Sequence, residues 1–588
     1  MKGYIYKNRW YLSFGLLAGI ILLTSFIPRF CDIMKFLPYY SIDENEIVDF
    51  AVGYFGGDLD QHFYSYGPLM SYLMALVYYV MSLFSSLSAE EFVQQVFFDN
   101  TPLYYTARLV NGCIAIATGW VVFDIIRRLW NKPLAFFSLP LLMFPFADFI
   151  VAFTVRVDTL LGLLYALSVL FMIKAFDGKT IKNILLSALC AGMAFACKPM
   201  PAMLLLPSLM LGFVFLHFKE QEKFKVFNNK NTSCVSSKDS FLRRFIKSIL
   251  YILKDKNFYL FLTVLVISAF LFFPHAFLNW SGPDGFIDQQ FGRIAFESGK
   301  NNTPPGWRID KHLRVMGLIY VYTGFIGIIY GTVIAFIRKN YKQIIVLILP
   351  IILVMAFSRV VSRDYWYTPI VYFLAIGIVI ITNEIFNYTR SKNIRLVIGM
   401  FILSLMMLRP AASLVKQSKI MIPHSISAYE EVNTEFAARE WIEENISDGT
   451  NIGMYGYYVL LPRLVDYNVD RQASIGEYFM YYRKENKYFV EQFEKAHQKY
   501  VSNKKNKTYQ LTKQVNFEDK DGEQINFDLR YRRKKYEPYL KELLMRNKVD
   551  YLVTTHKQDE SWNNRLIKSF KKKDYRYGRE IFIYEIKQ

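Results

Sequence analysis

Long apolar stretches separated by short basic segments fill the first two thirds of the chain. A helix needs roughly 20 apolar residues to cross the hydrocarbon core of a bilayer. The stretches that come near this length predict membrane-spanning helices at 11–28, 103–126, 133–150, 159–175, 182–198, 200–217, 258–278, 315–337, 343–357, 366–385 and 396–413. The first stretch resembles a signal peptide, but the bulky residues from Phe26 to Phe30 offer no cleavage site. We therefore expect a retained anchor.

Basic residues between these stretches predict the orientation of the chain in the membrane. Lys and Arg concentrate in the cytoplasmic loops of membrane proteins. With a cytoplasmic N-terminus, the basic segments fall inside: 127–132, 174–182, 219–256, 338–342 and 390–395. If the apolar run Leu69 to Phe84 also crossed, every later loop would invert. We therefore expect that run to lie along or dip into the interface, in an external loop over 29–102. Further external loops are expected at 279–314 and 358–366.

Residues 415–588 have a different pattern. Ala437 to Ile446 shows helical periodicity, and 451–456, 550–553 and 580–584 are typical of strands. About 170 residues suffice for one soluble α/β domain. We therefore predict a polytopic α-helical membrane domain over 1–414, with about 11 spans, and an extracytoplasmic soluble α/β domain over 415–588. The polar stretch Lys484 to Lys535 is expected to be mobile at its tips.

Composition further narrows the class of protein to which the chain can belong. A mean hydropathy of +0.16 and 17% aromatic residues exclude an ordinary soluble domain. The net charge of +20 comes from cations that lie between apolar runs, which indicates topology and anionic-lipid contacts rather than nucleic-acid binding. The five cysteines show no metal-ligand spacing. No nucleotide-binding loop or Gly-x-Ser-x-Gly elbow is present, whereas a donor presented by a lipid needs neither.

Two adjacent acids follow the first predicted span. Asp43 and Glu44 lie at the predicted outer boundary of the membrane, in the loop that later contains Tyr66-Gly67-Pro68. A carboxylate at this boundary can act as a general base toward a substrate held in lipid. The structural alternative is a solvated acid, or an N-cap for a helix that begins near Asn45.

Charged residues also lie where later spans meet the outer face. Arg156 and Asp158 stand at the mouth of one span, where charges are costly and are paired or functional; a structural ion pair or a helix cap is the alternative. Lys198 lies in a Lys-Pro break between two apolar runs. This lysine can meet an anionic head group, or it can snorkel from a kinked hairpin.

The two later external loops add cations and aromatic rings. Arg293 and Arg363 offer the planar donor fork that suits phosphate. Each arginine, taken alone, is equally compatible with a solvated or lipid-facing role. Tyr365 and Tyr367 flank Trp366, so they can form either an interfacial aromatic belt or a wall on which a sugar stacks.

The order and spacing of these motifs resemble the GT-C membrane glycosyltransferases, in the branch of the dolichyl-phosphate-mannose–protein mannosyltransferases and bacterial lipid A aminoarabinose transferases. The resemblance covers roughly residues 1–410. It is carried by Asp43-Glu44, Tyr66 to Leu69, Arg108, Arg156 to Asp158, Gly192 to Lys198, Gln289 to Arg293, Pro304 to Trp307 and Arg363 to Pro369.

The resemblance implies a polyprenyl-phosphate sugar as donor and a catalytic base that matches Asp43, with Glu44 orienting the acceptor or a cation. Our donor-phosphate candidates are Lys198, Arg293 and Arg363. For the substrate pocket we expect Tyr66, Arg156, Asp158, Gln290, Tyr365 and Tyr367. The chain departs from the aminoarabinose branch at Tyr66 and Gln290, which stand where that branch has a metal-binding Glu and a His. Gly67 likewise replaces a phosphate-binding Lys. We therefore expect no zinc site and leave a requirement for another divalent metal open.

These observations predict an inverting glycosyltransferase of the plasma membrane that moves a sugar from a polyprenyl-phosphate donor to a hydroxyl of a glycan, lipid or protein at the external face. We expect a monomer that contacts membrane lipids. One alternative is a surface-polysaccharide polymerase or ligase that uses a lipid diphosphate, although the long external loop contains only His312. The other is a lipid-linked sugar transporter or flippase, which would favour mid-span charges and repeated halves.

Overall fold

The computed structural model describes a set of residues that excludes the first 41. It covers residues 42–61, 63–96, 101–143, 155–178, 180–228, 241–282, 285–299, 318–360, 368–389, 391–421, 434–455, 487–502, 509–512, 514–518, 524–528, 540–555, 557, 565–571 and 580–586. The predicted first span at 11–28 therefore lies outside the described residues.

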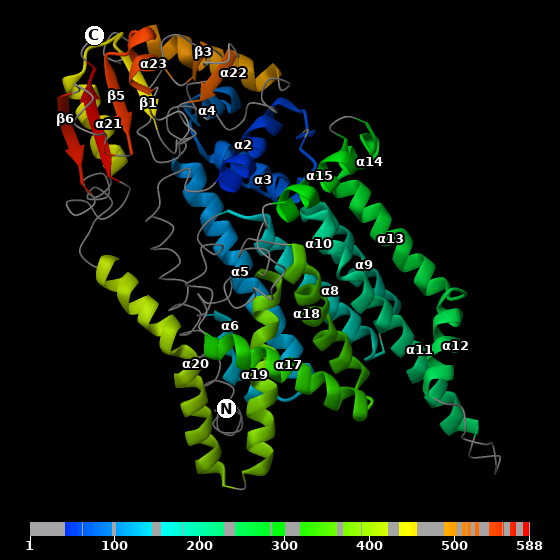
Figure 1. Ribbon diagram of the computed structural model, residues 1–588. Helices are drawn as coiled ribbons and strands as arrows, with labels where there is room; N and C mark the ends of the chain where they lie inside the picture. The colour runs from blue at the N-terminus through cyan, green and yellow to red at the C-terminus, as the bar shows by residue number, and fades with distance from the viewer. Residues whose placement is uncertain are drawn as a thin grey trace. The chain divides into compact units, whose positions relative to one another are not determined.

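Helices dominate the chain as far as residue 421 (Figure 1). They are α2 (Ile42–Gly53), the 3-10 helix η1 (Tyr54–Gly56), α3 (Leu69–Phe84), α4 (Ala89–Val96), α5 (Thr101–Leu129), α6 (Lys132–Met143), α8 (Val157–Ala175), α9 (Thr180–Cys197), α10 (Pro199–Met203), α11 (Leu206–Asn228), α12 (Phe241–Ile252), α13 (Lys256–Phe272), α14 (Pro274–Leu278), α15 (Phe286–Gly299), α17 (Leu318–Ile337), α18 (Tyr341–Val360), α19 (Thr368–Tyr388) and α20 (Lys392–Met421).

Several of these helices can cross a membrane, as predicted. By length and composition, the qualifying helices among the described residues are Pro102–Leu129, Val157–Ala175, Pro199–Lys219, Ile319–Ile337 and Pro369–Tyr388. Shorter apolar helices overlap the remaining predicted spans beyond residue 100. The mostly helical, membrane-compatible fold is therefore confirmed, whereas the number of eleven spans stays a prediction.

Proline breaks two of the apolar runs. α9 ends at Cys197, and Lys198 is extended, with φ −157° and ψ 96°, before Pro199 opens α10. This break was predicted. The second break was not: the expected continuous span 258–278 divides into α13 and α14, because Pro274 disfavours the helical conformation at Phe273. Phe273 adopts φ −148° and ψ 58°. The prediction of one unbroken helix here is therefore wrong.

Small residues let the apolar helices approach closely. A Cβ on Gly192 of α9 would lie 1.8 Å from Ser268 Oγ of α13, and one on Gly327 of α17 would lie 2.0 Å from the carbonyl oxygen of Gly377 in α19. Close backbone contact between small residues is the usual way in which helices associate where water provides no driving force. α9 packs on both α8 and α13, and α17 packs on α19 (Figure 1).

The chain forms two compact units. In the described residues, one unit consists of Asp60–Met74 and Thr106–Lys419, and so holds most of the apolar helices. The other consists of residues 42–59, Ala75–Tyr105 and the segment from Ile420 onward. The first predicted external loop is thus divided between the two units. The expected functional division at residue 414 stays a prediction.

The C-terminal part contains a mixed sheet of five strands in the order β2-β1-β5-β7-β6. β1 pairs parallel with both β2 and β5, whereas β7 pairs antiparallel with β5 and β6. The described elements are α21 (Thr434–Asn445), β1 (Asn451–Tyr455), α22 (Lys487–Ser502), β2 (Gln510–Thr512), β3 (Gln514–Glu518), β4 (Gln524–Asp528), α23 (Leu540–Arg546), β5 (Tyr551–Thr554), β6 (Arg565–Phe570) and β7 (Ile581–Glu585). The predicted helix and the three predicted strands are confirmed.

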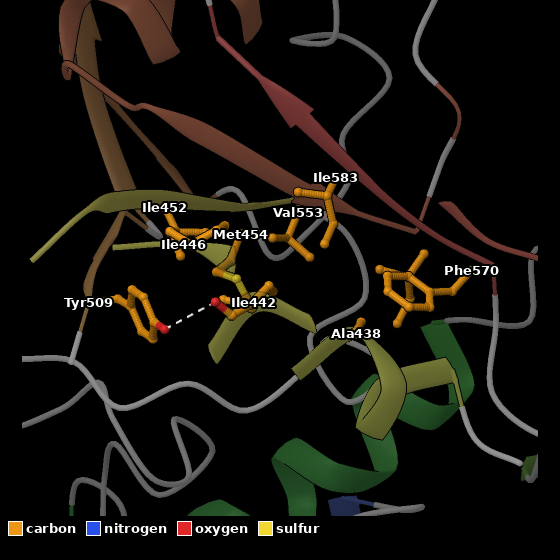
Figure 2. Packing of buried hydrophobic residues seen from close by; sticks show 10 residues of the cluster. Ala438, Ile442, Ile446, Ile452, Met454, Tyr509, Val553, Phe570 and Ile583 are labelled. Carbon is orange, nitrogen blue, oxygen red and sulfur yellow. Dashed lines mark hydrogen bonds between the residues drawn. The ribbon is translucent and has the colours of Figure 1, made fainter. Parts of the chain in front are cut away.

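Helix α21 covers one face of this sheet (Figure 2). The shared core consists of Ala438, Ile442, Ile446, Ile452, Met454, Tyr509, Val553, Phe570, Ile581 and Ile583. Tyr509 buries its ring and donates its hydroxyl proton to the carbonyl oxygen of Ile442 at 3.3 Å, so the polar end of the tyrosine is satisfied within the core.

Helix α22 lies in the stretch for which the sequence predicted no element. In the same unit it packs against α4, where Gln94 Nε2 donates to Oε1 of the buried Gln492 at 2.8 Å. Tyr488 fills the space beside Gly56, since a Cβ there would lie 2.5 Å from the Tyr488 Cβ. The burial of Tyr488 and the nearby charge of Glu90 raise the pKa of the Tyr488 hydroxyl. The helix is therefore stabilised by contacts with a segment about 400 residues earlier in the chain.

Candidate functional site

The break between α9 and α10 holds a buried ion pair. Lys198 Nζ donates to Asp158 Oδ1 at 2.8 Å, and the two side chains are only 2% and 4% exposed. Asp158 lies in the first turn of α8, which Arg156 precedes in an extended conformation. A charge buried in apolar surroundings needs a partner of opposite charge, and here Lys198 and Asp158 are each other's partner. The predicted charges at 158 and 198 are thus brought into direct contact, although the sequence had suggested Arg156 as the partner of Asp158.

The loop before α3 is seated on this break. The ring centroid of the buried Tyr66 lies 5.3 Å from Lys198 Nζ, in cation–π range. The next residue, Gly67, donates its backbone N–H to the Cys197 carbonyl at 2.9 Å. A Cβ on Gly67 would lie 1.9 Å from the Ala196 carbonyl oxygen, so only glycine fits this contact. The predicted pocket residue Tyr66 therefore lies beside the predicted phosphate-binding Lys198.

Helix α15 holds the same loop from another side. Gln289 Oε1 accepts the backbone N–H of Tyr64 at 2.6 Å, and Gln290 donates its amide to the Tyr64 carbonyl. Gln61 closes the loop on itself by donating to the Tyr66 carbonyl at 2.7 Å. The predicted pocket residue Gln290 is buried, and its amide fixes the backbone two residues before Tyr66.

A second polar cluster, which the sequence reasoning missed, ties this loop to α14 and the turn after it. The Tyr64 hydroxyl donates to Asp60 Oδ2 at 3.0 Å, and Asn279 Nδ2 donates to both the Tyr64 oxygen at 2.6 Å and Asp60 Oδ2 at 3.2 Å. His275 Nδ1 lies 3.3 Å from Asp60 Oδ2. The break at Pro274 places His275 and Asn279 here, and that proline was the available signal.

The two candidate catalytic acids belong to the other compact unit. Asp43 and Glu44 lie in helix α2, and the Glu44 side chain is fully buried. The described helix begins at Ile42, so the acids lie within it rather than ahead of a helix that starts near Asn45. The side chain of Asp43 lies outside the described residues.

The remaining candidates lie partly or wholly outside the described residues. Arg293 lies in α15, but its side chain is outside the described set. Arg363, Tyr365 and Tyr367 fall entirely outside it. The structure therefore brings together Tyr66, Asp158, Lys198 and, through the loop backbone, Gln290. The roles of all the candidates stay predictions.

Metal-binding residues do not cluster in the part of the chain that the structure describes: no three His, Cys, Asp or Glu side chains there are placed to hold an ion. At the two positions where a related branch has metal ligands, Tyr66 faces Lys198 and Gln290 bonds the loop backbone.

Comparison with known proteins gives a family match over this region. Residues 67–230 match the model of the family described as dolichyl-phosphate-mannose-protein mannosyltransferase. The matched residues make up less than half of the chain. The matched segment contains Gly67, Asp158 and Lys198. No curated protein matches the chain by sequence.

Two solved structures align with the chain. The archaeal oligosaccharyltransferase AglB from Archaeoglobus fulgidus, in complex with an inhibitory peptide and a dolichol-phosphate, aligns at 11% identity with a TM-score of 0.47 and covers 93% of this chain and 70% of its own. ArnT from Cupriavidus metallidurans in the apo state aligns at 10% identity with a TM-score of 0.47 and covers 98% of both chains. The match of residues 67–230 confirms the expected resemblance of this chain to the GT-C membrane glycosyltransferases, in the branch of the dolichyl-phosphate-mannose–protein mannosyltransferases.

Proposed function

We propose that the protein is an inverting glycosyltransferase that moves a sugar from a polyprenyl-phosphate donor to an acceptor hydroxyl at the external face of the membrane. The family match over residues 67–230 is the observation that carries the proposal. The matched family is named for a lipid-phosphate sugar donor, which supports a donor of the same chemistry here. Lys198 and Asp158, both within the matched segment, and Tyr66, the residue just before it, are in contact and add a fixed cation.

In the proposed reaction Asp43 acts as the general base. It takes the proton of the acceptor hydroxyl while the hydroxyl oxygen attacks the anomeric carbon. The bond between that carbon and the phosphate oxygen breaks, and its electron pair leaves with the polyprenyl monophosphate. One direct displacement inverts the anomeric centre. A positioned base of this kind contributes about 10²–10⁴-fold to the rate.

Lys198 is the described cation best suited to the leaving phosphate. Asp158 and Tyr66 hold its ammonium group in one place, so little reorganisation is needed when charge develops on a leaving group. Arg293 and Arg363 are further proposed phosphate ligands, and Glu44 is proposed to orient the acceptor.

The test is transfer by purified protein from a radiolabelled polyprenyl-phosphate sugar. We expect Asp43→Asn to lower the rate by about 10²–10⁴-fold while the melting temperature in detergent stays at the wild-type value. The matched control is Glu440→Gln, which removes one exposed carboxylate on α21 and is expected to transfer normally. A normal rate for Asp43→Asn would overturn the assignment of the base.

Mass spectrometry of lipid that co-purifies with the protein tests the donor class separately. The proposal expects a polyprenol that bears one phosphate and one sugar, and this result would also identify the sugar. A lipid diphosphate that carries a longer glycan would instead favour a polysaccharide polymerase or ligase.

A further inference from the structure

Helix α12 separates its apolar and basic residues onto opposite sides. Successive residues of an α-helix turn by about 100°, so the residues of one kind gather on one face. The apolar face consists of Phe241, Leu242, Phe245, Ile246, Ile249 and Leu250, and the basic face of Arg243, Arg244 and Lys247. This separation is typical of helices at membrane interfaces.

Among the side chains of α12 that the structure describes, the buried ones lie on one side of the helix. α12 packs against α11, where the rings of Tyr251 and His217 stack with centroids 3.9 Å apart. Ser248 and Ile252, one turn apart, are buried. By contrast, Ile249 and Leu250 are 42% and 58% exposed. The apolar face at Ile249 and Leu250 thus has room for another partner.

The position of α12 points to the membrane as that partner. The candidate span that includes α11 ends at Lys219, two residues beyond the His217 ring that α12 contacts. At its other end, α12 joins apolar helix α13 through a tight turn, in which Asp255 Oδ1 accepts the backbone N–H of Asn257 at 2.9 Å and caps α13. α12 therefore joins the ends of two apolar helices, and we expect both ends to lie at the same edge of the bilayer.

We propose that α12 binds anionic phospholipid in the leaflet at this edge, with its apolar face against the acyl chains and its cations on the head-group phosphates. Covering Ile249 and Leu250 with hydrocarbon removes apolar surface from water. Three cations along the polar side complement an anionic lipid, and each contributes about fivefold to surface binding. A symmetric contact with a second copy would instead bring the same cations together. This inference does not depend on glycosyl transfer.

Photo-crosslinking in nanodiscs tests the proposal with the full chain. Leu250 is replaced by benzoylphenylalanine, and the protein is reconstituted in equal amounts of phosphatidylglycerol and phosphatidylcholine. Mass spectrometry of the adducts is expected to show phosphatidylglycerol in excess by about tenfold or more. Raising the salt from 0.1 M to 1 M shortens the Debye length from about 10 Å to 3 Å, so the excess is expected to shrink.

Two sets of substitutions test whether the cations of α12 cause the preference for phosphatidylglycerol. Arg243→Gln, Arg244→Gln and Lys247→Gln together are expected to equalise the two adducts, and Lys247→Gln alone to lower the excess about fivefold. The matched control neutralises three exposed cations of the C-terminal segment, with Lys557→Gln, Arg565→Gln and Lys571→Gln, and is expected to keep the excess. Equal adducts in the parent protein would overturn the proposal, as would an adduct to a second copy of the chain.

Discussion

Two lysine–carboxylate contacts in this protein have almost the same length but very different surroundings. Lys198 and Asp158 lie 2.8 Å apart with 2% and 4% of their side chains exposed. Lys495 and Glu491 lie 2.7 Å apart with 46% and 60% exposed. Water and salt screen the second pair, whereas the first was desolvated when it formed. Burial rather than distance therefore decides what the loss of one partner costs.

The two pairs also differ in what they connect. Lys495 and Glu491 are one turn apart on α22, and Lys495 Nζ also lies 3.9 Å from Glu90 Oε2 of α4, again between exposed side chains. Lys198 and Asp158 are 40 residues apart and join the break after α9 to the start of α8. Tyr66 packs on the same lysine. A change at the buried pair is therefore expected to spread into the loop that it supports.

Removing one member of the buried pair is expected to have the largest effect. Lys198→Met leaves the Asp158 carboxylate buried without its described ion-pair partner, which costs about 3–5 kcal/mol. We expect a large fall in the melting temperature in detergent, together with loss of sugar transfer.

A double substitution separates charge from packing in this experiment. Lys198→Met combined with Asp158→Leu removes both charges, and it is expected to be more stable than Lys198→Met alone, because no unpaired charge remains. Transfer should stay lost if Lys198 binds the donor phosphate. A double variant as unstable as the single one would show that the charge of Asp158 is not the cause.

Gly67→Ala tests how closely the loop is seated on the break. The added Cβ would meet the Ala196 carbonyl oxygen at 1.9 Å, and backbone cannot move aside as a flexible side chain can. We expect a cost of about 1–3 kcal/mol, seen as a lower melting temperature. Gly112→Ala in α5 is the matched control, since a Cβ there meets nothing within 4 Å; it should be neutral or slightly stabilising.

The break at Lys198 illustrates what sequence can predict. A Lys-Pro pair between two apolar runs fixes the ends of α9 and α10 locally, and a charge at that place needs a partner. The strands β1, β5 and β7 were equally visible, because each is a short apolar run between turn residues. In each case the signal lies within about ten residues of the element that it predicts.

Non-local contacts set the limit of that prediction. Arg156 is only two residues from Asp158, yet Asp158 pairs with Lys198, 40 residues away. Asp60 and Tyr64 meet Asn279 across more than 200 residues. Likewise, α22 is polar enough to read as a loop, and its packing against α4 is invisible to a local pattern. Partners of this kind follow only from the tertiary fold.

Tyr64→Phe sharpens the comparison with a contact made by an uncharged side chain. The substitution keeps the ring but removes the hydroxyl that donates to Asp60 and accepts from Asn279. We expect a loss of about 1 kcal/mol, less than for either preceding single substitution. The measurement is the melting temperature in detergent. A loss as large as that of Lys198→Met would mean that the hydrogen bonds of Tyr64, and not the buried ion pair, hold the loop.

A smaller, pH-dependent effect is expected at the start of α4. The backbone N–H and hydroxyl of Ser88 donate to Glu91 Oε2 at 2.9 and 3.0 Å, and these bonds lower the pKa of the Glu91 carboxyl below its ordinary value of 4.5. A depressed folded-state pKa stabilises the protein above the unfolded-state pKa, and this contribution disappears as the pH falls through the folded-state value. The difference in melting temperature between wild type and Glu91→Gln should therefore shrink in acid. A difference that stays constant down to the folded-state pKa and below it would contradict this account.

Lys495→Gln is expected to have the smallest effect. Glu491 raises the pKa of Lys495, so any stabilisation from their contact is fully present below the unfolded-state pKa and is lost as the pH rises through the folded-state pKa. Even in the favourable range both groups keep most of their hydration, and holding two long side chains together costs entropy. The melting temperature at neutral pH should match that of wild type within error, at low and at high salt. A fall comparable to that of Lys198→Met would mean that the length of an ion pair, and not its burial, governs its worth in this protein.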